Sequence, residues 1–365
     1  MAGCSTEAMT NIGGDDDGGF GFTVSNVDVG SLDFSNVGDV QIGDEKSIYT
    51  DLGGLLPSSN GGASNYQVIQ QSNGLSLGVF TVQSLEIQAN ATVHASGVNG
   101  LVIVALDDIT IDGKLNADSR ETGVLQGAGA GEDDTPEDSG NGLGGGGAGG
   151  VARAGAGGSF CGIGGDGGGN DGTSPSIAPA PYGSPELSPL VAGSQGGNGQ
   201  FGTGGRGGGA IQLVAGGTIT VTGSVSAGGK GGEGSGQYAN GASQTAGGAG
   251  AGGAILLEAH AISVGGSLSV NGGGGGGKGY GDDAMPGSIP AAGAIAGDDK
   301  MAGGDGGAAT LIDGAPGQNG TATTAGGGGG GAGRIRFNTH TGAASITGTL
   351  SPSASTECVT QGLTR

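Results

Sequence analysis

The sequence predicts an all-β protein, a right-handed parallel β-helix whose coils carry long glycine-rich insertions along one edge. Short segments alternate apolar and polar residues at period two, which is typical of half-buried strands. These segments recur at similar positions relative to one another, as expected of a solenoid built from about one coil per repeat. Glycine supplies 96 of the 365 residues and gathers between the segments.

The composition excludes other glycine-rich classes. Collagen needs a strict Gly-X-Y period with abundant proline, whereas this chain has 11 prolines and no such period. A wholly disordered chain is opposed by the periodic Ile, Val and Leu segments. Aromatic residues make up only 3% of the chain and tryptophan is absent. We therefore expect a thin core of stacked aliphatic side chains.

The charge and hydropathy limit the partners. The formal net charge is −22, which disfavours nucleic acid because phosphates require a basic surface. Such a charge suits a solvated exterior or cation binding. No run of about 20 apolar residues predicts a transmembrane segment.

Residues 1–20 are predicted to form a disordered leader. The sequence Met-Ala-Gly-Cys-Ser-Thr at its start looks like the end of a lipoprotein signal, with Cys4 as the candidate for lipidation and a lipid anchor. A chance similarity at the start of the chain is the alternative.

Residues 21–74 are predicted to supply N-terminal strands that cap the solenoid. Within them, 21–50 contain short alternating pairs, and 51–74 are expected to be a polar loop. The pairs are Phe22 and Val24, Val27 and Val29, Leu32 and Phe34, and Val40 and Ile42.

The β-helix itself is predicted over residues 75–350, organised around the repeat at Arg206–Ala227. The last two strands of four repeats keep an interval of four residues, and a glycine lies between them. Each of these glycines is expected to be a corner with a special backbone conformation, and Ile111, Ile219 and Ile262 are expected to stack as one ladder. The intervals and glycines are Ile111–Leu115 with Gly113, Val221–Val225 with Gly223, Val264–Leu268 with Gly266, and Ile346–Leu350 with Gly348.

Three insertions interrupt the repeats, at 118–209, 228–253 and 271–333. Each leaves after a third strand and returns before a first strand, which places all three on one edge of a solenoid. Glycine-rich chains can pack side by side as extended helices with three residues per turn, here called polyglycine II helices. Ordered packing of this kind is predicted, with solvated loops as the alternative, and residues 351–365 are predicted to be a C-terminal tail.

A family resemblance rests on three similar segments. Gly-Gly-Gly-Ala-Ile-Gln-Leu-Val-Ala at 207–215, Gly-Gly-Ala-Ile-Leu-Leu-Glu-Ala at 252–259 and Gly-Ala-Gly-Arg-Ile-Arg-Phe-Asn-Thr at 331–339 resemble uncharacterised glycine-rich surface β-solenoid proteins common in myxobacteria and their relatives, as does 100–117. The resemblance covers about residues 75–350. It implies an exported, surface-linked solenoid and no known activity.

Two further cysteines accompany Cys4. If Cys4 is lipidated, Cys161 and Cys358 form an even pair, and an exported chain favours a disulfide between them. The spacing of the two residues does not by itself establish this pairing.

No catalytic or cofactor site is predicted. His94, His260 and His340 have no metal-ligand spacing and are expected to be surface polar positions, with stacking of the repeats, which would bring some of them together, as the alternative. Acidic pairs recur along the chain, and binding of calcium by the loops that carry them is a second, weaker hypothesis. The sequence does not identify which residues would bind a metal ion. The pairs are Asp107-Asp108, Asp133-Asp134, Asp282-Asp283 and Asp298-Asp299.

These observations predict a structural or adhesive protein at the outer surface of a bacterial cell or outside it, and not an enzyme. Self-association, including filament formation through the open ends of a solenoid, and surface polysaccharide are the expected partners. The alternatives are a carbohydrate-active β-helix enzyme, which works with paired carboxylates, and an ice-binding protein. Thr218, Thr220 and Thr222 provide one row of hydroxyl groups for ice binding.

Overall fold

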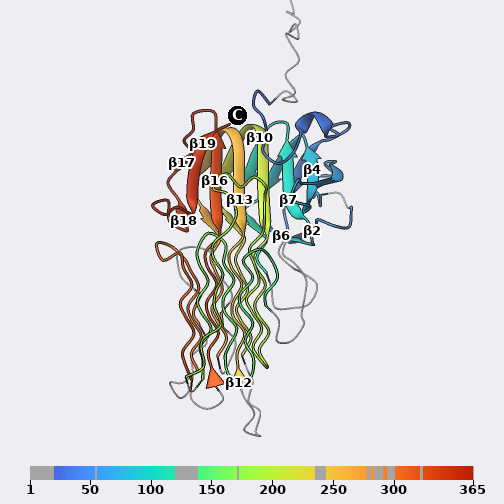
Figure 1. Ribbon diagram of the computed structural model, residues 1–365. Coiled ribbons are helices and arrows are strands. Elements are labelled where there is room, and N and C mark those ends of the chain that lie inside the picture. Colours follow the sequence, from blue (N-terminus) through green and yellow to red (C-terminus); the bar gives the residue numbers. More distant parts are fainter. Residues whose placement is uncertain are drawn as a thin grey trace, which may run out of the picture.

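A computed structural model describes residues 20–53, 56–119, 139–170, 172–234, 244–277, 281–282, 291–293, 301–320 and 324–364. Strands and extended segments make up this part of the chain, and its one helical element is the short 3-10 helix η1 (Val29–Ser31). Figure 1 shows two regions, a body of strands and a bundle of long extended segments beside it. The protein is therefore all-β, as the sequence predicts.

The strands follow one another along the chain as short elements. They are β1 (Asp39–Ile42), β2 (Lys46–Tyr49), β3 (Asn65–Gln70), β4 (Ser76–Val82), β5 (Ser84–Ile87), β6 (Thr92–Ser96), β7 (Gly100–Ala105), β8 (Ile109–Ile111), β9 (Lys114–Asn116), β10 (Ala210–Val221), β11 (Ser224–Ser226), β12 (Gln244–Thr245), β13 (Ala254–Val264), β14 (Ser267–Ser269), β15 (Thr324–Ala325), β16 (Arg334–Thr339), β17 (Ser345–Ile346), β18 (Thr349–Ser351) and β19 (Val359–Leu363).

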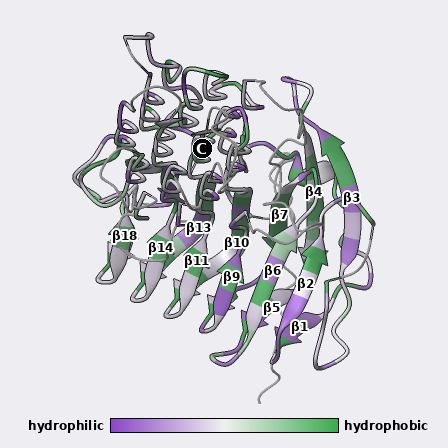
Figure 2. Ribbon diagram, turned by 90° about the horizontal axis from the view of Figure 1, so that it is seen from below, coloured by the Kyte–Doolittle hydropathy of each residue, from purple (hydrophilic) through white to green (hydrophobic). Residues whose placement is uncertain are grey.

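Two parallel sheets form the body. In the larger sheet, one row contains β4, β7, β10, β13, β16 and β19. A second row lies beside it: β8 pairs with the later half of β10, β17 pairs with the later half of β13, and β5 and then β1 continue the row beyond β8. The smaller sheet has the order β18-β14-β11-β9-β6-β2, seen as a row in Figure 2. All pairs in these two sheets are parallel except β3 with β4. Neighbouring strands come from successive repeats, so the repeats align as the sequence pattern requires.

The register corrects the expected aliphatic ladder. Ile219 lies level with Ile109 and Ile262, whereas Ile111 lies level with Val221 and not with Ile219. The expected position of Ile111 was wrong by two residues. A shift of two keeps the same side chains on the inner face, so Ile111 still belongs to the core, one level further along the strand.

The corner glycines are needed for close stacking, not for a left-handed backbone. Gly113, Gly223, Gly266 and Gly348 do not have a positive φ, so the special conformation expected from the sequence is wrong. A Cβ added to Gly223 would overlap the Gly113 oxygen, and one added to Gly266 would overlap the Gly223 oxygen. The corners therefore stack so closely that only glycine fits.

The core lies between the two sheets and continues on the outer face of the larger sheet. Ile103, Leu213 and Leu257 face the inner core, while Val102 and Val104 belong to a second buried cluster on the outer face. Because both faces of the sheet are covered here, β7 is an unbroken apolar segment instead of an alternating one.

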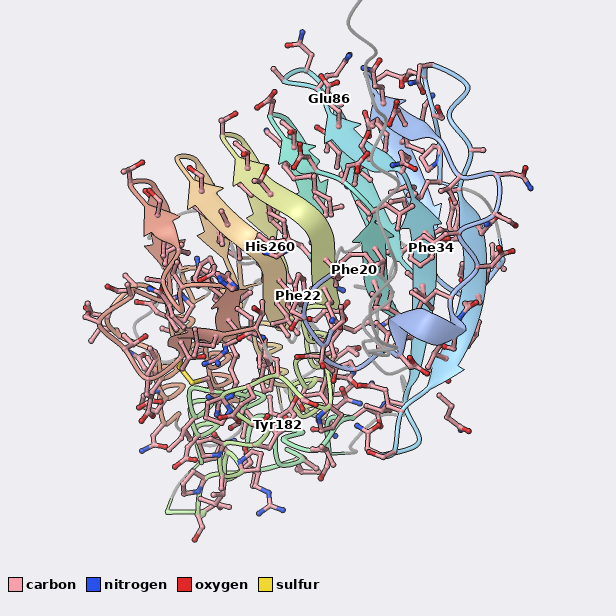
Figure 3. The ribbon with its side chains drawn as sticks, turned by 90° about the horizontal axis from the view of Figure 1, so that it is seen from above. Phe20, Phe22, Phe34, Glu86, Tyr182 and His260 are labelled. Atoms are coloured by element: carbon pink, nitrogen blue, oxygen red, sulfur yellow. A yellow bond between two sulfur atoms is a disulfide. The ribbon has the colours of Figure 1, made fainter. Side chains whose placement is uncertain are left out.

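Residues 20–38 contain no strand, although strands are expected there from the sequence. Residues 20–34 cross the outer face of the larger sheet and include η1 (Figure 3). Phe20, Phe22, Val24 and Val27 are buried there, so their alternation comes from an extended segment that buries every second side chain on the sheet. We call residues 20–34 the strap.

Two other segments differ from expectation. The loop expected at 51–74 contains β3, which pairs antiparallel with β4 at one edge of the larger sheet. The tail expected at 351–365 contains β19, which pairs with β16. Both segments therefore extend the sheet.

The described parts of the insertions pack together as the bundle in Figure 1. The Gly205 N–H donates to the Gly248 oxygen at 2.8 Å, linking the first insertion to the second. Gly165 donates to the Gly329 oxygen at 2.7 Å, linking the first to the third. Hydrogen bonds between segments replace those that water would otherwise supply, so these described segments are ordered.

None of the described residues forms a helix that is long and apolar enough to cross a membrane.

Candidate functional site

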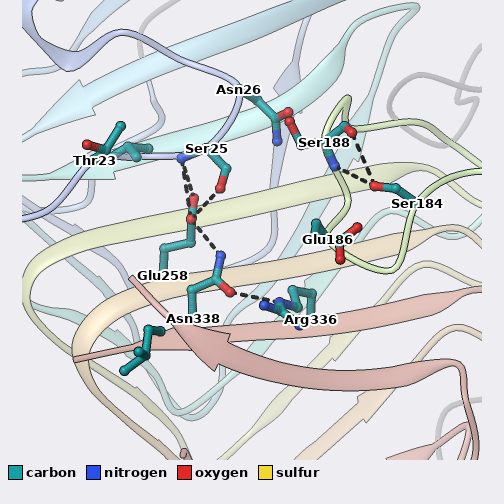
Figure 4. A pocket seen from close by; sticks show the side chains of 11 residues that line it. Thr23, Ser25, Asn26, Ser184, Glu186, Ser188, Glu258, Arg336 and Asn338 are labelled. Atoms are coloured by element: carbon teal, nitrogen blue, oxygen red, sulfur yellow. Dashed lines mark hydrogen bonds between the residues drawn. The ribbon is translucent and has the colours of Figure 1, made fainter. Parts of the chain in front are cut away.

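A pocket of about 420 Å³ opens on the outer face of the larger sheet. It lies where the strap, the loop at 184–188 of the first insertion, and strands β13 and β16 meet (Figure 4). Most of its lining residues have polar side chains. The lining residues are Thr23, Val24, Ser25, Asn26, Ser184, Glu186, Ser188, Glu258, Arg336, Asn338 and Leu363.

Glu258 forms the buried wall of this pocket. Strand β13 alternates its side chains, so Glu258 points to the outer face next to Leu256, while Leu257 points to the inner core. Its side chain lies under the strap, and the residue is only 1% exposed. A carboxylate at this depth requires hydrogen-bond partners.

The strap and two sheet residues supply those partners. Both the Ser25 backbone N–H, at 3.2 Å, and its hydroxyl, at 2.8 Å, donate to the Glu258 carboxylate. Gln212 Nε2 donates at 2.7 Å and Asn338 Nδ2 at 2.9 Å. Both oxygens of Glu258 therefore accept hydrogen bonds from protein groups.

Further hydrogen bonds connect this cluster to its surroundings. Gln212 Nε2 also donates to the backbone carbonyl oxygen of Ser25 at 2.6 Å. Asn26 Nδ2 donates to Gln212 Oε1 at 3.2 Å and to the Leu187 oxygen at 2.9 Å. Arg336 Nε donates to Asn338 Oδ1 at 2.7 Å. The network ties together the strap, three repeats of the sheet and the first insertion.

Burial raises the pKa of Glu258 above its ordinary value of 4.5, because the charged form loses its hydration. The hydrogen bonds from Asn338, Ser25 and Gln212 act in the opposite direction and offset part of this effect. Since the donors occupy the carboxylate, Glu258 is suited to holding the strap in place. The exposed groups that remain for a ligand include the Glu186 carboxylate and the polar side chains of Thr23 and Ser188.

We expect the raised pKa of Glu258 to make stability depend on pH. The folded state holds the proton more tightly than the unfolded state, so the contribution of Glu258 to stability is fully present below its ordinary pKa of 4.5 and is lost as pH rises through its folded pKa. Urea melts of wild type and Glu258→Gln, which does not titrate, measure this difference. The advantage of wild type over the variant should shrink from pH 4.5 to pH 8. An advantage that grows with pH would show that the hydrogen bonds outweigh burial.

Of the cysteines in the described residues, Cys161 and Cys358 form the disulfide that the sequence pairs. The sulfurs lie 2.04 Å apart and the Cα atoms 5.6 Å apart, and both residues are buried. Cys4 lies outside the described residues, and so does most of the predicted leader.

His260 and His340 are exposed, as expected from the sequence, and the stacking of repeats brings their rings together, with centroids 5.8 Å apart. His260 lies within β13, and His340 directly follows β16. His94 on β6 is only 7% exposed, and its Nε2 lies 3.4 Å from Glu45 Oε1. Parallel register therefore unites two of the three, and the third is buried, contrary to expectation.

The acidic pair at a strand corner has a structural role. Asp107 accepts from Gln83 Nε2 at 2.6 Å, and Asp108 accepts from the Thr218 backbone N–H at 2.7 Å. Of the other predicted pairs, Asp282 is described, whereas Asp133, Asp134, Asp283, Asp298 and Asp299 lie outside the described residues. No group of three or more His, Cys, Asp or Glu side chains suited to a metal ion occurs within the described ranges.

The buried cluster around Glu258 was not found from the sequence. One signal was present: Glu258 interrupts an apolar segment at the position that Val214 occupies in the preceding repeat. Its partner Ser25 lies 233 residues away along the chain, and no spacing rule connects the two.

Comparison of the chain with family models, with curated proteins and with solved structures finds no match.

Proposed function

We propose that this protein is a non-catalytic structural or adhesive element, located at the outer surface of a bacterial cell or outside it. In this proposal the body is a right-handed parallel β-helix, and the insertions form a rigid bundle of polyglycine II helices. The bundle carries the proposal, because extended backbone segments from all three insertions bind one another directly.

Several observations support the β-helix. Equivalent strands of successive repeats pair in register, as in β8, β10 and β13, where Ile109, Ile219 and Ile262 are level. The chain passes from the larger sheet to the smaller one at each corner glycine, and it enters an insertion after the corners at Gly113, Gly223 and Gly266. Right-handed connections are the rule between parallel strands of one sheet.

The surroundings of single glycines support polyglycine II helices. Gly248 donates to the Gly197 oxygen at 2.9 Å and accepts from Gly205 at 2.8 Å, so its two polar groups bind different stretches of chain. An added Cβ on Gly248 would overlap the Ala156 oxygen. An extended helix of the polyproline II type has no internal hydrogen bonds, which leaves its backbone groups able to bind neighbouring chains.

Export to the surface is supported by the disulfide and by the acidic charge. Disulfides persist mainly in oxidising compartments, and a net charge of −22 keeps an exposed body solvated. The resemblance to glycine-rich surface proteins of myxobacteria points the same way. Self-association or surface polysaccharide remains the proposed partner, with Glu186, Ser184 and Ser188 available for polar contacts in the pocket.

The alternative of a carbohydrate-active enzyme and the alternative of an ice-binding protein have less support. The Glu258 carboxylate is occupied by four protein donors, which leaves it poorly placed for acid–base chemistry. The hydroxyls of Thr218 and Thr222 donate to Asp108 at 2.9 Å and to Asp112 at 2.5 Å. Two of the three hydroxyls in this threonine row are therefore already bonded within the protein, which weakens the case for ice binding.

Hydrogen exchange tests the rigid bundle. We expect amides in Gly140–Gly169 and Gly272–Gly277 to exchange as slowly as those of β10 and β13, because they bind carbonyls of other segments. Exchange at the rate of an unfolded peptide in the bundle, beside protected strands, would contradict a rigid element.

Location is tested separately by protease treatment of intact cells of the source organism. Loss of the protein from intact cells supports surface display, and full protection until lysis argues against it.

A further inference from the structure

We propose that His260 and His340 form a binding site for a divalent transition-metal ion that prefers imidazole ligands, such as Cu²⁺. The site lies at the outer face of the larger sheet, where the strap crosses the middle of β13 and the end of β16. It is independent of the function proposed above and involves no residue of the Glu258 cluster.

The sheet register places the two imidazoles together. Ala259 is level with Thr339 in the sheet. His260 directly follows Ala259, and His340 directly follows Thr339 at the end of β16. The His340 N–H donates to the His260 oxygen at 3.2 Å, which holds the two backbones as direct neighbours. Both side chains are exposed, so a metal ion can reach them from solvent.

The ring geometry suits a shared metal. With metal–nitrogen distances of about 2.0–2.1 Å, the ring centroids of a bis-imidazole site lie roughly 4.5–6.4 Å apart, depending on the angle between the two metal–nitrogen bonds. The observed centroids are 5.8 Å apart, with an angle of 50° between the ring planes. Two imidazoles on the protein leave the other coordination positions to water, as in an exposed site.

The strap determines which ring nitrogen of His260 carries the hydrogen. Its Nε2 lies 2.9 Å from the Phe20 carbonyl oxygen, and a carbonyl oxygen only accepts hydrogen bonds. Nε2 therefore carries the hydrogen, and in the neutral ring the lone pair is on Nδ1. Metal-binding histidines commonly donate their other ring N–H to a backbone carbonyl in this way.

The aromatic contact restrains the same ring. Phe22 packs edge-on against His260, with centroids 5.6 Å apart, and Figure 3 shows His260 beside Phe20 and Phe22. An imidazole held on two sides loses little freedom when it binds a metal. Imidazole ligands suit Cu²⁺, Ni²⁺ and Zn²⁺, of which Cu²⁺ binds most tightly to a given site.

The test is a Cu²⁺ titration of the full-length protein, followed by calorimetry and by electron paramagnetic resonance. All samples carry Cys4→Ser to remove a competing thiol. The variants are His260→Gln, which retains an amide N–H for the Phe20 carbonyl, and His340→Asn. His94→Ala is the matched control, since it removes the remaining histidine.

We expect one Cu²⁺ per chain with a spectrum showing two imidazole nitrogens. Each variant at 260 or 340 should raise Kd about tenfold or more and leave a single imidazole in the spectrum, whereas His94→Ala should change neither. Zn²⁺ should raise the Tm of the parent and of His94→Ala only. Equal Cu²⁺ affinity in all variants, a spectrum without two imidazoles in the parent, or loss of binding in His94→Ala would overturn the site.

Discussion

Gly274→Val should destabilise the protein by about 3 kcal/mol or more, because the bundle has no room for a side chain at this position. Gly274 donates to the Asp282 oxygen and accepts from Gly232, both at 2.9 Å. A Cβ added to it would overlap the Ala292 oxygen and lie 2.9 Å from the Gly293 nitrogen. Since these are backbone atoms, the neighbour cannot yield by rotating a side chain.

Denaturant melts of a graded series measure this effect. Gly274→Ala adds only the clashing atom and should already destabilise, with Gly274→Val falling further. Thr310→Val is the matched control: it places valine at an exposed position of the third insertion and should remain within about 0.5 kcal/mol of wild type. A neutral Gly274→Val would mean that position 274 is solvated and that the bundle is not packed there.

Loss of the Cys161–Cys358 disulfide should lower stability by about 4–5 kcal/mol. The bond joins residues 197 positions apart, and closing so long a loop removes much conformational entropy from the unfolded chain. The bond also joins the first insertion to the residue just before β19. Backbone hydrogen bonds hold both cysteines beside the start of β16: the Cys358 carbonyl oxygen accepts from the Ile335 N–H at 2.9 Å, and the Cys161 N–H donates to the Ala332 carbonyl oxygen at 3.1 Å. The first insertion and the last strand would separate more easily without the disulfide.

The measurement compares Cys161→Ser/Cys358→Ser with wild type in denaturant, with and without reductant. Reductant should lower the midpoint of wild type and leave the double variant unchanged. Cys4→Ser serves as the control and should retain the response to reductant. Two free thiols at positions 161 and 358, found by mass analysis of protein prepared under oxidising conditions, would contradict the bond.

The strands could be predicted from the sequence because their signal is local. Alternation at Ile211, Leu213 and Ala215 indicates a strand with one apolar face whatever else the chain does, although here the opposite face, with Gln212, is buried as well. Alternation at Phe22 and Val24 has the same form, yet these residues belong to the strap. An extended segment lying on a sheet also buries every second side chain, and the pattern cannot distinguish the two.

The candidate sites depended on pairing, which a single strand does not reveal. Glu258 is held by Ser25 from the other end of the chain. The histidine pair was within reach, since the similar segments 252–259 and 331–339 are each followed by histidine. Aligning those two repeats places His260 beside His340, a contact that motif spacing along the sequence does not detect.

The interleaving of the insertions determines when the protein can fold. Residues near the start of the bundle bind partners close to its end: Gly162 donates to the Ala332 oxygen, and Gly168 to the Gly326 oxygen, both at 2.9 Å. Contacts so distant in sequence make folding slow, because a long loop must close before they form. The bundle cannot close until the ribosome has made almost the whole chain. Until then the glycine segments remain without their partners, so the chain stays unfolded there for most of its synthesis, which is the state that the export proposed above requires.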